Sequence, residues 1–211
     1  MSITSYGENE KKGMTTREIA ITAMGIALFV VLSLCLQVPI YQNYYLCLGY
    51  FVMAVWLYSF GVLKGTIVGT LGVILYCILT GGLRGMPGWT VGNFVIGIIV
   101  GFNFKFTKSL REICKNKVSG IWINVSAVLF TVIDAFVIVF ATTLGILIAK
   151  SFIEHLLYAQ PMLVRITTNS TANIADIVTL IVALPLVLYM DKVLHRFFPN
   201  FVKKNDKAVK C

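Results

Sequence analysis

Charge is scarce in this sequence, and the shortage excludes whole classes of protein. Only 13% of the 211 residues are charged, whereas 58% are hydrophobic. A water-soluble domain needs enough polar sequence to coat its core, and this chain has too little. The 2 histidines and 5 cysteines also lack the close spacing of a metal clip or a redox pair. We therefore expect neither a metal site nor a cofactor.

Short catalytic and nucleotide-binding motifs are missing as well. The chain contains no HExxH, GxSxG or CxxC motif, and the predicted topology places His155 and His195 on opposite sides of a membrane. An intramembrane enzyme is therefore disfavoured. A GxxxxGK[ST] loop is also absent, so any use of ATP must come from a partner.

Long apolar runs occupy most of the chain instead. A spanning helix needs roughly 20 apolar residues, and uncharged or nearly uncharged windows of about that size recur. The sequence thus predicts an all-α integral membrane protein, a bundle of six transmembrane helices. The expected spans are Ile19–Leu36, Tyr44–Leu63, Gly65–Thr80, Trp89–Phe104, one within Val118–Ala149, and Thr168–Met190. The first is too long for a cleavable signal, and Ser151–Arg165 is expected to continue the fifth helix or lie along the outer interface.

The cations predict the orientation of this bundle. With both ends inside, 15 of the 18 Lys and Arg residues fall on the cytoplasmic side, which leaves Arg84, Lys150 and Arg165 outside. We interpret the net charge of +9 as a topology signal and as contacts with anionic lipid, not as a nucleic-acid surface. The expected organisation is a cytoplasmic segment 1–18, a membrane domain 19–190 and a cytoplasmic basic tail 191–211.

Polar residues inside a bilayer are expensive, so their positions point to function. On the sixth predicted helix Asn169, Asn173 and Asp176 have i, i+4, i+7 spacing, which places them on one face near the outer surface. Trp89 and Asn93 form an i, i+4 pair on the fourth helix at the same predicted depth. This convergence predicts a pocket that opens outward and suits a small planar polar molecule.

Three further parts of the chain are candidates for the same pocket. Arg84 lies in the turn before the fourth helix. Asp134, about 20 Å along the fifth helix at 1.5 Å per residue, is also expected in the outer half. The loop Gln37–Asn43, with Tyr41 and Asn43, is expected to fold over the pocket as a lid.

Each candidate also has a structural interpretation. Trp89 and the tyrosines can belong to an interfacial aromatic belt, and Asn169 can cap its helix. Asp134 and Asp176 can be held by interhelical hydrogen bonds alone.

The pattern resembles the substrate-binding (S) component of an energy-coupling factor (ECF) vitamin transporter. The resemblance covers roughly residues 15–195 and includes Ala23-x-x-x-Ala27 after the polar start Thr15-Thr16-Arg17-Glu18. The segments GMPGWTVGNFVIGIIVG and NSTANIAD resemble the riboflavin-type branch.

The resemblance implies specific partners. Ala23 and Ala27 would form a flat surface against a transmembrane coupling subunit, which two cytosolic ATPases drive. The ligand would be a vitamin or related metabolite, with riboflavin one candidate, and the location would be a prokaryotic plasma membrane. A self-sufficient carrier or channel, and a scaffold protein without ligand, remain the alternatives.

Overall fold

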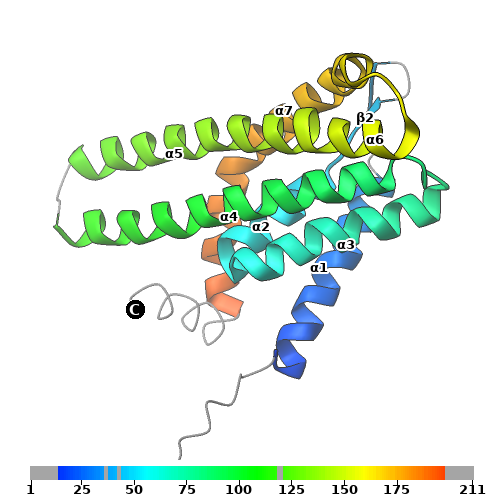
Figure 1. Ribbon diagram of the computed structural model, residues 1–211. Coiled ribbons are helices and arrows are strands. Elements are labelled where there is room, and N and C mark those ends of the chain that lie inside the picture. Colours follow the sequence, from blue (N-terminus) through cyan, green and yellow to red (C-terminus); the bar gives the residue numbers. More distant parts are fainter. Residues whose placement is uncertain (1–13, 36–37, 42–43, 118–120, 198–211) are drawn as a thin grey trace, which may run out of the picture.

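The protein is a bundle of helices interrupted by one small hairpin (Figure 1). The structure, a computed structural model, describes the backbone of residues 14–35, 38–41, 44–117 and 121–197. The hairpin consists of β1 (Val38–Tyr41) and β2 (Tyr44–Leu46), paired antiparallel. The helices are α1 (Thr16–Cys35), α2 (Gly49–Phe60), α3 (Val62–Thr80), α4 (Met86–Lys117), α5 (Ile121–Thr142), the π-helix η1 (Thr143–Lys150), α6 (Ser151–Tyr158) and α7 (Met162–Phe197).

The surface of the bundle is apolar, as expected for a protein in lipid. Large side chains such as Phe136 and Leu163, each 78% exposed, point away from the core. Within the described residues five helices are long and apolar enough to cross a membrane: α1, α3, α4, α7 and the continuous α5–η1–α6. The prediction of a helical membrane protein is confirmed at this level, and the count of six crossings stays a prediction.

Helix α2 differs most from its predicted span. Tyr44–Leu46 pairs as a strand, and the helix runs only from Gly49 to Phe60, about 18 Å at 1.5 Å per residue. Gly61 ends it early because its backbone has φ 93°, a conformation that glycine adopts freely. Eleven of the 12 residues of α2 are buried, since α1, α3, α4 and α7 all pack against this helix.

The other helices are longer than predicted at their polar ends. Helix α4 continues from Phe104 through the basic stretch to Lys117, and α7 begins at Met162 and extends past Met190 to Phe197. Helix α6 continues η1 from Ser151 to Tyr158, so this part of the segment Ser151–Arg165 prolongs the fifth helix, whereas Met162–Arg165 begins α7. Charged residues interrupt hydropathy without interrupting a helix, which explains the short predictions.

Glycines let α4 and η1 approach backbone to backbone. A Cβ added at Gly92 would lie 2.8 Å from the Gly145 carbonyl oxygen, and one added at Gly145 would lie 2.6 Å from that of Gly92. This crossing fixes the start of α6 beside the start of α4.

The two ends of the described chain lie toward the same end of the molecule. In Figure 1 the first turn of α1 and the last turn of α7 lie toward one end of the molecule, whereas α6 and the hairpin lie toward the other. An even number of crossings would produce this arrangement.

Candidate substrate site

Tyr50 lies at the centre of a buried hydrogen-bond network between three helices. Trp89 Nε1 on α4 donates to the Tyr50 hydroxyl at 2.9 Å. That hydroxyl donates to Asn93 Oδ1 at 2.8 Å, and Asn93 Nδ2 donates to the Gly69 carbonyl on α3 at 3.1 Å. Tyr50 and Asn93 are each 0% exposed, so the network orders the ends of α2, α3 and α4 around a polar centre.

Asp176 brings a carboxylate from α7 to the same centre. It is buried and lies within hydrogen-bonding reach of the Tyr50 hydroxyl. The ammonium of Lys150, the last residue of η1, interacts with it through charge. An isolated buried carboxylate would be very costly in free energy, and this cation offsets part of that cost.

A second polar cluster joins α6 to α7 beside the first. Asn169 Nδ2 donates to Ser151 Oγ at 3.0 Å and to Glu154 Oε2 at 3.1 Å. Arg165 Nη1 lies 3.8 Å from the same Glu154 oxygen. Asn169, Ser151 and Glu154 are all buried, so this is an internal cluster and not a surface ion pair.

At this site, two side chains retain hydrogen-bonding capacity that no described residue uses. Asn173 Oδ1 and Arg165 Nε are buried, and neither has a hydrogen-bond partner within the described part of the chain. Asn173 lies one helical turn after Asn169 and one turn before Asp176, so its acceptor falls between the two clusters. Unsatisfied buried polar groups are rare in native proteins and point to a ligand or water.

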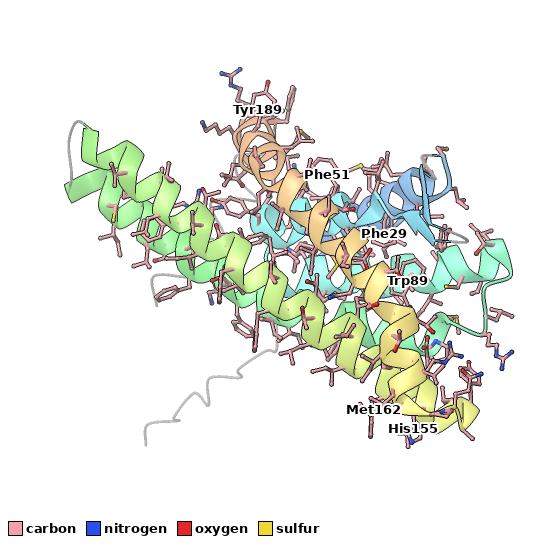
Figure 2. The ribbon with its side chains drawn as sticks, turned by 90° about the horizontal axis from the view of Figure 1, so that it is seen from above. Phe29, Phe51, Trp89, His155, Met162 and Tyr189 are labelled. Carbon is pink, nitrogen blue, oxygen red and sulfur yellow. The ribbon has the colours of Figure 1, made fainter. Side chains whose placement is uncertain are left out.

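The local backbone explains how these groups converge. The π-helix η1 has a wider turn than an α-helix, and π segments inside helices are frequent at functional sites. It precedes Ser151 and Glu154, three residues apart on the buried face of α6. Gly88 on α4 lets this face of α6 pack closely against α4. A Cβ at this position would lie 3.0 Å from both the Lys150 carbonyl oxygen and Glu154 Cγ. Figure 2 shows Trp89 toward the same end of the molecule as His155 and Met162.

Five of the predicted site residues are brought to this region, whereas Arg84 and Asp134 are not. Trp89, Asn93, Asn169, Asn173 and Asp176 take part as described. Arg84 lies in the exposed turn before α4, where its guanidinium stacks 5.3 Å over the Tyr158 ring and its carbonyl accepts from the Tyr158 hydroxyl. Tyr41 ends β1, and its side chain, like the whole of Asn43, lies outside the described residues.

The predicted position of Asp134 was wrong. Its Oδ2 accepts from Arg111 Nη2 at 2.7 Å, and its Oδ1 accepts from Asn103 at 2.7 Å and Thr107 at 2.9 Å. These partners lie toward the basic end of α4, away from Trp89. Because α4 continues to Lys117 and α5 begins only at Ile121, the first turns of α5 return alongside that end. A buried polar cluster therefore lies toward the basic end of the bundle as well.

Several site residues were missed by reasoning from the sequence. Tyr50 lies within an apolar run that is rich in aromatic residues, so the sequence pattern does not distinguish it from its neighbours. Lys150, Ser151, Glu154 and Arg165 were placed outside the bundle as parts of a polar connection. A charge that directly follows a long apolar run, as Lys150 does, was the signal that could have drawn attention to them.

The predicted docking residues lie on an open face of α1. Ala23 and Ala27 are exposed, together with Ala20 one turn earlier. The opposite face is buried through Gly25, where an added Cβ would lie 2.6 Å from Trp56 Cε2. Small residues thus line both faces of this helix segment, and among the described residues only the Gly25 face is packed against other helices.

A helical membrane bundle with a buried polar site between its helices defines a class of transport and binding proteins. A model described as the ECF-type riboflavin transporter S component matches residues 13–192, and the chain belongs to this family. The family resemblance noted in the sequence is thereby confirmed. Members of this family are membrane-embedded, vitamin-binding subunits of ECF transporters, and they are not enzymes.

Two curated relatives and one solved structure resemble the chain over most of its length. The chain is 26% identical over 182 residues to the UPF0397 protein str0306 of Streptococcus thermophilus, covering 84% of this chain and 91% of that one. It is 28% identical over 182 residues to the UPF0397 protein YdcD of Lactococcus lactis, with the same two coverages. The crystal structure of a biotin S component from an ECF-type ABC transporter has the same fold, with TM-score 0.58, 15% identity, and coverage of 85% of this chain and 95% of that chain.

Proposed function

We propose that the polar centre around Tyr50 and the Asn169 cluster hold one small water-soluble vitamin or related metabolite, with riboflavin one candidate. One observation carries the proposal: two buried polar clusters meet between α2, α4, α6 and α7, and Asn173 Oδ1 between them has no described partner. Trp89, Asn93, Asn169, Asn173 and Asp176 are the proposed contacts. Arg84 and the hairpin residues Tyr41 and Asn43 are proposed to close the site.

Binding by the isolated protein tests this function. Purified protein in detergent should be stabilised by one compound in a thermal-shift screen of the B vitamins and their precursors, without ATP. Native mass spectrometry of the same preparation should show a co-purifying molecule of matching mass. A folded protein that responds to no compound would contradict the proposal.

Uptake is proposed to depend on separate subunits. A transmembrane coupling subunit would dock on the face of α1 that carries Ala23 and Ala27, because small side chains let a partner helix approach closely. Two cytosolic ATPases would drive the cycle. The location would be the plasma membrane of a prokaryote, with both chain ends in the cytoplasm.

A double substitution, Ala23→Trp with Ala27→Trp, tests docking apart from binding. Ligand affinity in detergent should remain within about twofold of wild type, whereas uptake in cells and co-purification of the coupling subunit should be lost. The matched control is Val182→Trp with Leu186→Trp on α7, an i, i+4 pair that is 71% and 47% exposed. Normal uptake by the α1 variant would refute the docking surface and leave the ligand site standing.

One observation favours a second candidate, a self-sufficient carrier. The Asp134–Arg111 cluster supplies polar groups toward the other end of the bundle, as a continuous pathway would need. Its carboxylate accepts three hydrogen bonds, however, which favours a structural role. Uptake into proteoliposomes that contain this chain alone would establish the carrier.

A further inference from the structure

A cavity of about 430 Å³ lies away from the proposed vitamin site, between α2, α4, α5 and α7. This volume is in the range of small-ligand sites, about 300–1,000 Å³. Its lining mixes cations, carboxylates and apolar groups, and includes Tyr58, Lys108, Arg111, Phe130, Asp191 and Lys192. The cavity therefore lies where the apolar stretches of α4 and α7 give way to their basic ends.

Arg111 supplies a donor that no described residue uses. Its Nη2 donates to Asp134 Oδ2 at 2.7 Å and to Thr131 Oγ1 at 3.3 Å. Its Nε is buried and has no hydrogen-bond partner among the residues that the structure describes. The Arg111 guanidinium lines the cavity, donates to the Asp134 carboxylate on one side and has an Nε–H without a described partner. A guanidinium with a remaining N–H donor can bind an oxyanion.

Two lysines add positive charge beside this donor. Lys108 Nζ lies 3.4 Å from Asp191 Oδ1 and 5.3 Å from the centre of the Tyr58 ring. Lys192 lines the same cavity and is exposed. An entering anion would therefore meet three cations, of which Arg111 and Lys108 are partly buried and Lys192 is exposed. The carboxylates of Glu112 and Asp191 line the same cavity.

Lipid-facing surface flanks the cavity on both sides. Val128 and Leu129 follow the lining residue Ala127 on α5 and are 63% and 57% exposed. Tyr189 follows the lining residue Leu188 on α7 and is 63% exposed. A ligand held here by its anionic group would have apolar helix faces beside it, which suits acyl chains and does not suit a fully hydrated solute.

We propose that this cavity binds the phosphate of an anionic phospholipid headgroup, with Arg111 and Lys192 as its main contacts. Basic pockets between transmembrane helices are a known physical solution for holding such headgroups. The bound lipid would tie together the ends of α4, α5 and α7. This site is independent of the vitamin site and of the docking face on α1.

Native mass spectrometry of the full chain in detergent tests the proposal. Phosphatidylglycerol should be retained about tenfold more strongly than phosphatidylcholine with the same acyl chains. Lys192→Gln and Arg111→Lys, which keeps a charge near Asp134 but removes Nε, should each weaken phosphatidylglycerol retention about fivefold. Lys105→Gln is the matched control, because Lys105 is an exposed cation of α4 outside the cavity lining.

Two results would overturn the proposal. Equal losses in Lys192→Gln and Lys105→Gln would show general attraction between basic helix ends and lipid, with no site. Displacement of the lipid by millimolar glycerol 1-phosphate would identify a soluble phosphate compound as the ligand. Because Lys192 is exposed, Lys192→Gln should fold even if Arg111→Lys does not. Phosphatidylglycerol retention by Lys192→Gln, compared with that by Lys105→Gln, therefore tests the proposal by itself.

Discussion

At the scale of single residues, Tyr50 supports the partners on either side of it. Tyr50→Phe removes the acceptor of Trp89 Nε1 and the donor to Asn93 Oδ1. Leaving such groups buried and unpaired costs about 1–3 kcal/mol, so the free energy of unfolding should fall by that amount. Thermal and denaturant unfolding in detergent measure it, with Tyr189→Phe, which is 63% exposed, as the control. An unchanged stability would show that water replaces the hydroxyl.

Substitutions of Asn169 and Asn173 should differ in their effects on protein stability and on ligand binding. Asn169→Ala removes two donated hydrogen bonds, to Ser151 and Glu154, and should destabilise the protein by about 1–3 kcal/mol. Asn173→Ala removes an oxygen without a described partner. It should leave stability within about 1 kcal/mol and weaken ligand binding by about 0.5–1.5 kcal/mol. Unfolding curves and ligand titrations of both variants test the contrast, and normal binding by Asn173→Ala would remove it from the site.

At the scale of elements, the crossing of α4 and η1 depends on two glycines. Gly92→Ala and Gly145→Ala would each place a methyl group within 3 Å of a facing carbonyl oxygen. Since backbone atoms cannot rotate away, we expect a loss of about 1–3 kcal/mol in stability. Gly82→Ala is the control, because the nearest atom to its added Cβ would be 3.5 Å away. Equal melting temperatures for all three variants would contradict this account of the crossing.

The apolar runs predicted where most of the helices lie in the sequence, but they did not predict the residues at which the helices begin and end. Hydropathy reports which residues prefer lipid, so Val62–Thr80 was found almost as it stands. It does not report where backbone hydrogen bonding stops, so the extension of α4 to Lys117 was missed. Nor does hydropathy separate a short apolar strand from a helix, which is why Tyr44–Leu46 was included in a span.

The site was predictable where one helix carried it. The spacing of Asn169, Asn173 and Asp176 fixes a shared face whatever the neighbouring helices do, and all three residues are buried. The predicted position of Asp134 along the bundle was wrong because that position depends on where the preceding helix, α4, ends. Tyr50 and Lys150 were missed because their contacts come from tertiary packing between α2, η1 and α7, which no local pattern encodes.

At the scale of the whole molecule, the distribution of cations predicts the orientation. Fifteen of 18 Lys and Arg residues would be cytoplasmic if both ends are inside. A green fluorescent protein fused after Cys211 should therefore fluoresce, and alkaline phosphatase inserted at Gly82 should be active. The reverse pattern of activities would invert the topology, and with it the side from which the ligand enters.

The continuous helix of α5, η1 and α6 also ties the protein to the membrane around it. Its candidate membrane span, Val125–Tyr158, has 34 residues, with the charged Lys150 and Glu154 near its end, roughly 50 Å at about 1.5 Å per residue. The hydrocarbon core of a typical bilayer is about 30 Å thick. Such hydrophobic mismatch is relieved by tilting the helix or by thickening the lipid locally, and each response has an energetic cost. Acyl-chain length should therefore act on this protein as a thermodynamic variable in its own right, because it biases the tilt of this continuous helix and with it the packing of α6 against α7.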